Sequence, residues 1–523
     1  MTSHQGHTAN DGARQHNGNV YGNMTNNTNN TFHAPSRTLD DAQRDGQALL
    51  KASGDGKTER VAMLIANGAN RNYTDDRGFS ALHHACYGGQ EETACSLIDD
   101  HGLDVDAVSK NYGTPLCVAA VKGHRQVVAM LIEKGASVRA RGGHLGSALH
   151  AACHAGDVEM VEMLLMGGIS LELTCTIQWS TGAPLQVVDL NNMQPTDYGT
   201  LSAIRIDQCR PVHIAAMNEH SDVLQLLLFN GAEPDAIARG TYSSEESGKS
   251  DSFACTALSF AETVACLSAL LDAGADIDHR DHSDATAMMC AAAGGNLPAL
   301  KLLIERGAFI DARMKYSDTA LHPTAMRGKT ASIRYLLAKG ADVTARNEHG
   351  FVPVMSAILT GRRQCVAIFT EFWRLQINAG TSSSHFRDDF TRERHIPFDA
   401  NETMSMLQDL RVNLDAPFQL VGKRYTPLWF AIERQIEEAV ELLLDLGASM
   451  KNDLGQKARD FALSCNRATR TQDWNSIIAV LDRYSSGMGV GVAATDRRGA
   501  APQIQGEDVL LMMLARGLKK VLR

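Results

Sequence analysis

The chain has 523 residues and carries a formal net charge of −10. This acidic balance excludes bulk electrostatic attraction to nucleic acid, which requires a basic footprint, so no nucleic-acid partner is expected. The eleven cysteines form no Cys-x-x-Cys pair, which argues against a zinc cluster or a disulfide framework and favours a reducing compartment.

No targeting or membrane segment is predicted. The N-terminus lacks the apolar run of a signal peptide, and no stretch approaches the roughly 18 uninterrupted apolar residues of a transmembrane helix. We therefore expect an intracellular protein, either cytoplasmic or nuclear.

Residues 1–41 are rich in Asn, Gly, Thr and His and almost free of Leu, Ile and Val. Such a segment cannot bury enough apolar surface to offset its conformational entropy, so the sequence predicts a disordered leader. An Asn-rich tract that associates with itself is the alternative.

A short phrase recurs from residue 80 onward, with steps of 34 or 33 residues within each uninterrupted run; its full form, Ser/Thr-Ala-Leu-His, stands at Ser80, Ser147 and Thr319, and the other openings are variants of it. The regular openings are Ser80, Thr114, Ser147, Thr286, Thr319 and Val352. The opening hydroxyl suits a helix N-cap, and the glycine that ends most units suits a left-handed C-cap. Each unit is therefore predicted to be a helix, a tight turn and a second helix, and a period of this size indicates a stacked array.

The 33-residue period is interrupted at several places, and these interruptions define the predicted organisation of the chain. The unit that opens at Thr256 is short, so its first helix must be truncated. The pieces Thr174–Trp179 and Leu185–Leu190 are β-prone and predict a hairpin-like insertion. The predicted segments after the leader are N-terminal repeats at 42–236 with an insertion at 172–206, a flexible insertion at 237–254, central repeats at 255–373, an insertion with a degenerate repeat at 374–425, a C-terminal repeat and cap at 426–484, a linker at 485–506 and an amphipathic basic helix at 507–523.

The period of about 33 and the Thr-Pro-Leu-His-x-Ala phrase resemble the ankyrin repeat over residues 45–485. The leader and the degraded units resemble those of fungal members of this family. The resemblance implies an all-α ankyrin-repeat solenoid of about ten to twelve helix-turn-helix units with loop insertions and short hairpin tips. It also implies that the opening-phrase histidines tie neighbouring backbone together, namely His83, His150, His213 and His322.

The resemblance further implies that hairpin tips and the exposed side of the first helices form a concave binding face. The candidate partner-binding residues on that face are Asp76, Arg77, His84, Tyr87, Lys110, Asn111, Lys122, Lys315, Tyr316, Arg327 and His349. Tyr and Arg are enriched at binding hot spots, so Tyr87, Tyr316 and Arg327 are the strongest candidates.

No catalytic residue, cofactor site or metal site is predicted. The glycines at 487–491 lack the preceding strand and following helix of a phosphate-binding loop, and His83-His84 has no further ligand at metal-site spacing. We expect a non-enzymatic scaffold or adaptor that binds protein partners. One alternative is an adaptor whose basic helix at 507–523 makes a weak membrane-surface or self-association contact. Another is a catalytic centre in the insertion at 172–206 or at 374–425.

Overall fold

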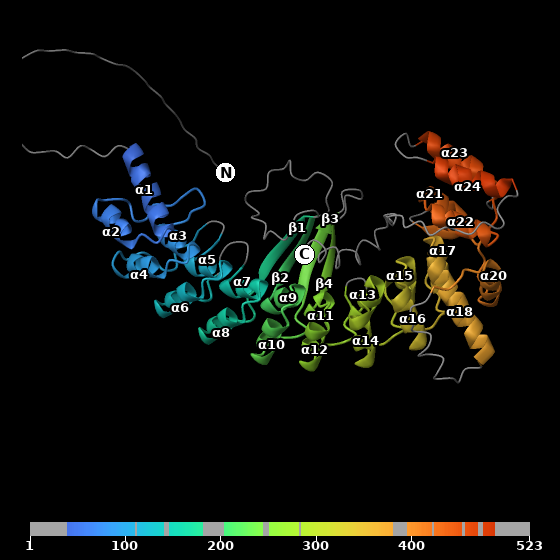
Figure 1. Cartoon of the computed structure of the whole chain (residues 1–523), viewed down its shortest axis with the longest axis horizontal. Helices are drawn as coiled ribbons and strands as arrows, with labels where there is room; N and C mark the ends of the chain where they lie inside the picture. Colours follow the sequence, from blue (N-terminus) through green and yellow to red (C-terminus); the bar gives the residue numbers. More distant parts are fainter. Residues whose placement is uncertain are drawn as a thin grey trace, which may run out of the picture.

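The computed structural model describes residues 39–109, 112–140, 146–180, 203–243, 250–281, 284–379, 395–420, 423–451, 455–468 and 474–486. These residues form an elongated, curved array of paired helices (Figure 1). Order begins slightly earlier than predicted, because the first helix starts at Leu39. The rest of the leader, most of the linker and the predicted helix at 507–523 lie outside the described residues.

The helices alternate between the inner and the outer side of the curve (Figure 1). The first helices of the units are α1 Leu39–Gly54, α3 Ala81–Tyr87, α5 Pro115–Val121, α7 Ala148–Ala155, α9 Pro211–Met217, α11 Ala257–Phe260, α13 Ala287–Gly294, α15 Leu321–Met326, α17 Pro353–Leu359, α21 Pro427–Glu433 and α23 Ala458–Ala468. The second helices are α2 Thr58–Ala66, α4 Glu91–Asp99, α6 Arg125–Glu133, α8 Val158–Met166, α10 Ser221–Phe229, α12 Val264–Asp272, α14 Leu297–Glu305, α16 Thr330–Ala338, α18 Arg363–Ala379, α20 Ala400–Asp409, α22 Glu437–Asp445 and α24 Asn475–Ser485. The predicted solenoid of ten to twelve units is confirmed.

The helix ends follow the predicted capping chemistry. Ser80, Ser147 and Thr286 each accept a hydrogen bond from the backbone N–H three residues later. At the other end of the unit, Gly135 and Gly340 have φ values of +85° and +92°, in the left-handed region where glycine avoids the steric penalty of a Cβ atom.

The opening-phrase histidines connect successive parts of the array, as the resemblance implies. The Nε2 atom of His83 donates to the carbonyl oxygen of Gly113 at 3.0 Å, and that of His213 donates to Ala236 at 2.8 Å. Equivalent bonds run from His150 to Cys209 and from His322 to Phe351. These rings are buried, and desolvation lowers the pKa of His83, His213 and His322, because burial disfavours the charged form.

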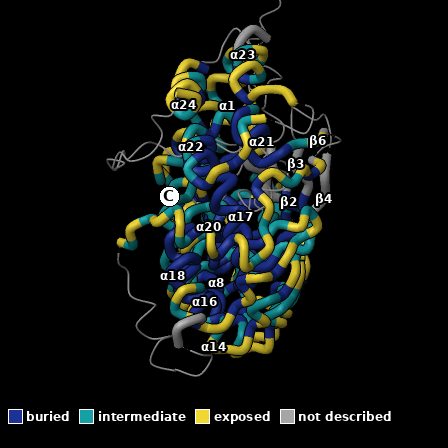
Figure 2. The backbone as a smooth tube through the Cα atoms, turned by 90° about the vertical axis from the view of Figure 1, so that its right-hand side faces the viewer, coloured by how far each residue is buried: buried dark blue, intermediate teal, exposed yellow. Residues whose placement is uncertain are grey.

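The hydrophobic core is a continuous layer between the two rows of helices. It extends from Leu49 in α1 to Leu481 in α24 and consists mainly of Ala, Leu, Ile and Val. Figure 2 shows buried residues through the middle of the array, with exposed residues along its margins. Because each unit packs on its neighbours, the core is elongated rather than central.

The segment that joins one helix pair to the next is called a finger. Two of these fingers, between α8 and α9 and between α10 and α11, form one antiparallel sheet near the middle of the array. Its strands are β1 Cys175–Ser180, β2 Ala203–Cys209, β3 Ala238–Ser243 and β4 Ser250–Cys255, in the order β1-β2-β3-β4. The pairing of β1 with β2 gives the predicted insertion a hairpin stem, whereas Leu185–Leu190 lies outside the described residues. Figure 1 shows the sheet rising from the inner side of the curve.

Both ends of the segment 237–254, for which the sequence predicts a flexible insertion, are strands, because β3 and β4 pair along six residues. The polar composition of these strands concealed them from sequence analysis. Backbone hydrogen bonds do not depend on apolar side chains, and β2 presents an edge to which β3 pairs.

The helix lengths depart from the regular repeat at α11 and at α18. Helix α11 has only four residues, which confirms the predicted truncation. Helix α18 continues to Ala379, so the predicted insertion at 374 begins inside a helix. The next described helix, α20, is followed by the hairpin of β5 Phe418–Leu420 and β6 Lys423–Tyr425.

The C-terminal helices dock on the start of α18. The Arg363 guanidinium lies 2.6 Å from a carboxylate oxygen of Asp445 and 3.9 Å from one of Glu441, both on α22. The backbone at Gly361 is so close to α22 that a Cβ atom there would lie 2.7 Å from the backbone nitrogen of Ala439.

Candidate functional site

The predicted partner-binding residues fall into two groups that the four-stranded sheet separates along the array (Figure 1). The N-terminal cluster comprises Asp76, Arg77, His84, Tyr87 and Lys122, from α3, its preceding finger and the end of α5. The C-terminal cluster comprises Lys315, Tyr316, Arg327 and His349, from two fingers and the end of α15. Lys110 and Asn111 lie outside the described residues.

Tyr87 is the centre of the N-terminal cluster. Its side chain is 42% exposed, and the Nζ atom of Lys122 lies 4.1 Å from the ring centroid. His124 donates from Nε2 to the Tyr87 carbonyl oxygen at 3.1 Å, which ties the end of α3 to the next unit. The arrangement presents an aromatic ring and a cation together, as occurs in cation–π pairs.

The finger before α3 is held by one carboxylate. Asp75 accepts hydrogen bonds from the backbone N–H groups of Arg77 and Phe79 at 3.0 and 2.8 Å. Its other oxygen lies 3.2 Å from Nε2 of His84. His84 is therefore half-buried and positions the finger, while Asp76 and Arg77 at the tip are exposed.

Tyr316 and His349 come from successive fingers and stack on each other in the C-terminal cluster. Their ring centroids are 6.3 Å apart, with an angle of 20° between the planes. The backbone N–H of Glu348 donates to the Tyr316 carbonyl oxygen at 2.9 Å, which holds the two fingers in register. The exposed Lys315 places Nζ 5.3 Å from the Tyr316 centroid.

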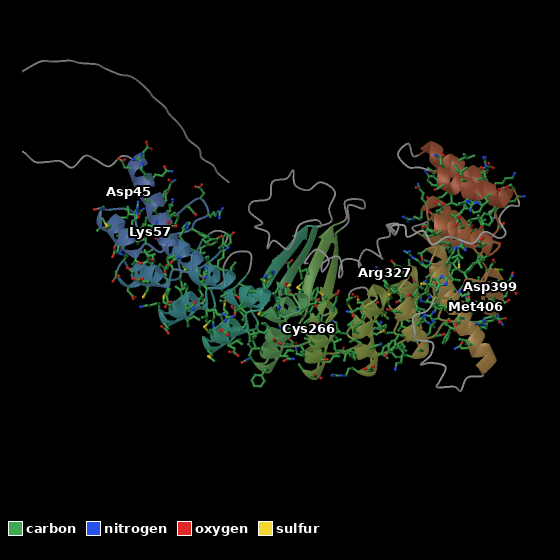
Figure 3. All side chains as sticks on the ribbon, viewed as in Figure 1. Asp45, Lys57, Cys266, Arg327, Asp399 and Met406 are labelled. Carbon is green, nitrogen blue, oxygen red and sulfur yellow. The ribbon has the colours of Figure 1, made fainter. Side chains whose placement is uncertain are left out.

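Arg327 differs from expectation, because its side chain is half-buried rather than exposed. It follows α15 on the inner side of the array (Figure 3), where Nε of Arg362 donates to the neighbouring Met326 carbonyl oxygen at 3.3 Å. This bond ties the next unit to the backbone beside Arg327.

Sequence reasoning missed the aromatic residues that support both clusters. Phe79 lies edge-on to Tyr112 at 5.1 Å and tilted against Tyr87 at 6.4 Å. In the C-terminal half, the rings continue from His349 through Phe351, Phe418, Tyr425 and Phe430. A sequence signal existed, since Phe79, Phe351 and Tyr425 each stand immediately before an opening phrase.

The described residues contain no group of three or more His, Cys, Asp or Glu side chains placed to hold a metal ion. Burial raises the pKa of most of the core cysteines, with that of Cys365 rising to about 12, which disfavours the thiolate. No helix in the described ranges combines the length and apolarity needed to cross a bilayer.

Comparison with known proteins agrees with this architecture. The family described as ankyrin repeats in three copies matches residues 30–109, 101–175 and 212–314, and the single ankyrin repeat matches residues 316–348. Together these matches cover more than half of the chain.

Similarity to whole proteins is partial. The Neurospora crassa ankyrin repeat protein nuc-2 is 25% identical over 236 residues, which are 45% of this chain and 18% of that protein. Human transient receptor potential cation channel subfamily A member 1 is 23% identical over 35% of this chain and 14% of the channel. The crystal structure of the human ASB11 ankyrin repeat domain is 23% identical, covers 50% of this chain and 98% of that domain, and has a TM-score of 0.36.

The chain spans less than a fifth of the length of either of these two relatives. What it shares with them is the repeat itself, and ankyrin repeats are protein–protein interaction modules. The 33-residue period, the capped helix pairs, the histidine bonds and the family matches all agree, and the chain belongs to the ankyrin-repeat family.

Proposed function

We propose that the protein is a non-catalytic scaffold or adaptor that binds protein partners on the inner side of its ankyrin array. The observation that supports this most directly is the pairing of exposed cations with aromatic rings in both clusters, Lys122 with Tyr87 and Lys315 with Tyr316. Tyrosine is among the residues enriched at the hot spots that dominate binding energy at protein interfaces.

The separation of the clusters makes the proposal more specific. The sheet rises between α7 and α11 (Figure 1), so a small partner would contact one cluster and a large or extended partner would contact both. The stacked rings of Tyr316 and His349 are held by neighbouring fingers before any partner arrives. Such preorganisation reduces the entropy lost on binding.

The test compares partner capture by the intact chain and by two double variants, using quantitative mass spectrometry of material bound from its native cells. One variant combines Tyr87→Ala with Lys122→Ala, and the other combines Tyr316→Ala with His349→Ala. The control combines Glu162→Ala with Gln225→Ala, exposed positions on the outer helices α8 and α10. Circular dichroism melts verify that each protein is folded.

We expect at least one double variant to lose a specific partner by roughly tenfold or more, because truncating two hot-spot residues costs at least about 1.4 kcal/mol. The control should recover that partner at the level of the intact chain. If all four proteins capture the same partners equally, the binding face lies elsewhere. Turnover of a small molecule by the purified chain would contradict the non-catalytic part of the proposal.

A further inference from the structure

Four of the eleven cysteines gather at the root of the four-stranded sheet. Cys153 belongs to α7, Cys175 begins β1, Cys209 ends β2 and Cys255 ends β4, and all four are buried free thiols. Burial raises the pKa of Cys209, and the nearby Cys175 and Cys255 raise it further. This row of thiols lies outside both binding clusters.

The strand register selects one pair from the four. Cys175 and Cys209 are partners at the end of the antiparallel pairing of β1 and β2, next to a register shift between Cys175 and Ile177. Opposed residues in such a pair have Cα atoms about 4.5–5.5 Å apart, which falls within the span of about 4.4–6.8 Å that a disulfide bridges. Cys209 and Cys255 lie on strands with β3 between them, so about two strand spacings, or roughly 9.5 Å, keep them apart.

The surroundings hold this pair in place. A Cβ atom on Gly146 would lie 2.4 Å from that of Cys175, so β1 begins directly against the residue that precedes the α7 opening phrase. His150 donates from Nε2 to the carbonyl oxygen of Cys209 at 3.1 Å, which fixes the end of β2. Both strand ends are therefore anchored to the same unit.

We propose that Cys175 and Cys209 form a cross-strand disulfide under oxidation by a peroxide and so fasten the root of the sheet between the two clusters. One thiol is oxidised by hydrogen peroxide to a sulfenic acid, which releases one water. The facing thiol then attacks that sulfur, the S–S bond forms, and the hydroxyl leaves with the second proton as another water. Two thiols and one peroxide thus give one disulfide and two waters.

The fold also determines when this reaction occurs. Burial raises the pKa of Cys175 to about 12, and the reactive species is the thiolate. The closed sheet therefore protects both thiols, and oxidation follows the opening of the strand ends. The disulfide therefore forms slowly in the resting protein. It accumulates only as the paired ends of β1 and β2 open.

The experiment uses the full-length reduced chain, treated with hydrogen peroxide, alkylated with N-ethylmaleimide under denaturing conditions and analysed by mass spectrometry. Cleavage at Arg205 and at Glu159 and Glu172 places Cys153, Cys175 and Cys209 on separate peptides. We expect a linked peptide pair that contains Cys175 and Cys209, with a mass two hydrogens below that of the separate thiol peptides. Cys175→Ser and Cys209→Ser should each abolish the link, and Cys255→Ser should preserve it.

The half-buried Cys95 reports whether the oxidant is active. If Cys95 is oxidised while Cys175 and Cys209 are both recovered as alkylated thiols even after prolonged incubation with peroxide in a urea concentration just below the unfolding transition, which opens the strand ends, the proposal is wrong. A link between Cys153 and Cys175 would also overturn it. The intact chain alone decides between these results, so poor folding of a serine variant does not affect the conclusion. Because no partner is involved, the outcome is independent of the proposed binding function.

Discussion

Lys122 of one unit places its ammonium nitrogen 4.1 Å from the centre of the Tyr87 ring of the preceding unit. Both side chains are exposed, and His124 separately ties the Tyr87 backbone to the second unit at 3.1 Å. The same contact therefore contributes both to the junction between units and to the surface that a partner would meet.

A double-mutant cycle should detect this contact in the free protein. Tyr87→Leu combined with Lys122→Met should show a coupling free energy of about 0.5–1 kcal/mol, typical of an exposed cation–π pair. Urea unfolding of the four proteins gives this quantity. Lys315 is a weaker analogue, since its distance to the Tyr316 centroid is 5.3 Å, and a larger coupling there would contradict the distance argument.

The buried His213 should make the array sensitive to acid. Burial lowers its pKa to about 4, compared with an ordinary value of about 6.5. Between these values the unfolded chain binds a proton that the folded chain does not, so stability present above about pH 6.5 is lost as the pH falls towards 4. The loss from this residue is on the order of 3 kcal/mol.

His213→Gln should flatten that dependence, because glutamine does not titrate. The measurement is the free energy of unfolding at several pH values between 7 and 4.5, and the informative quantity is the difference in slope between the variant and the parent. Parallel curves would show that His213 is not a source of acid sensitivity. The other opening-phrase histidines with lowered pKa values, His83 and His322, should add to the slope that remains.

Two opening threonines should respond oppositely to loss of the hydroxyl. Thr286 caps α13 by accepting from the backbone N–H of Met289, so Thr286→Val should cost about 1 kcal/mol. Thr256 stands at the start of the truncated α11, and its buried hydroxyl has no hydrogen-bond partner among the described residues. Thr256→Val should be neutral or stabilising, since it removes an unsatisfied polar group. Equal losses in thermal melts would contradict this difference.

Alanine substitutions at two glycines distinguish the cost of backbone strain from the cost of a steric clash. Gly340 has φ of +92° and open space where a Cβ would lie, so Gly340→Ala should cost about 1 kcal/mol. Gly361 has φ of +67° and would place its Cβ 2.5 Å from that of Glu438, so Gly361→Ala should cost about 1–3 kcal/mol more, as overpacking does. Hydrogen exchange should show that the additional loss is concentrated in α21 and α22. A uniform effect along the array would mean that α22 does not depend on this contact.

The sequence could predict what one unit decides locally. The opening hydroxyl, the Leu-rich second helix and the closing glycine act within about 33 residues, so their positions fix the helices and caps of Ser80, Ser147 and Gly340. The short spacing after Thr256 likewise determines a four-residue α11, because the chain has no further residues for that helix. Tyr87 and Lys122 could be chosen by residue type and position within the unit.

Only the stacked structure decides what happens between units. The pairing of β2 with β3 joins fingers of different units, and the polar sequence of β3 gives no sign of it because backbone groups make the bonds. The stacking of Tyr316 on His349 and the partial burial of Arg327 likewise depend on how far each unit rotates against the next. That rotation is the sum of many small packing contacts spread over neighbouring helices, so repeat spacing determines that the units stack, while tertiary packing determines which side chains meet.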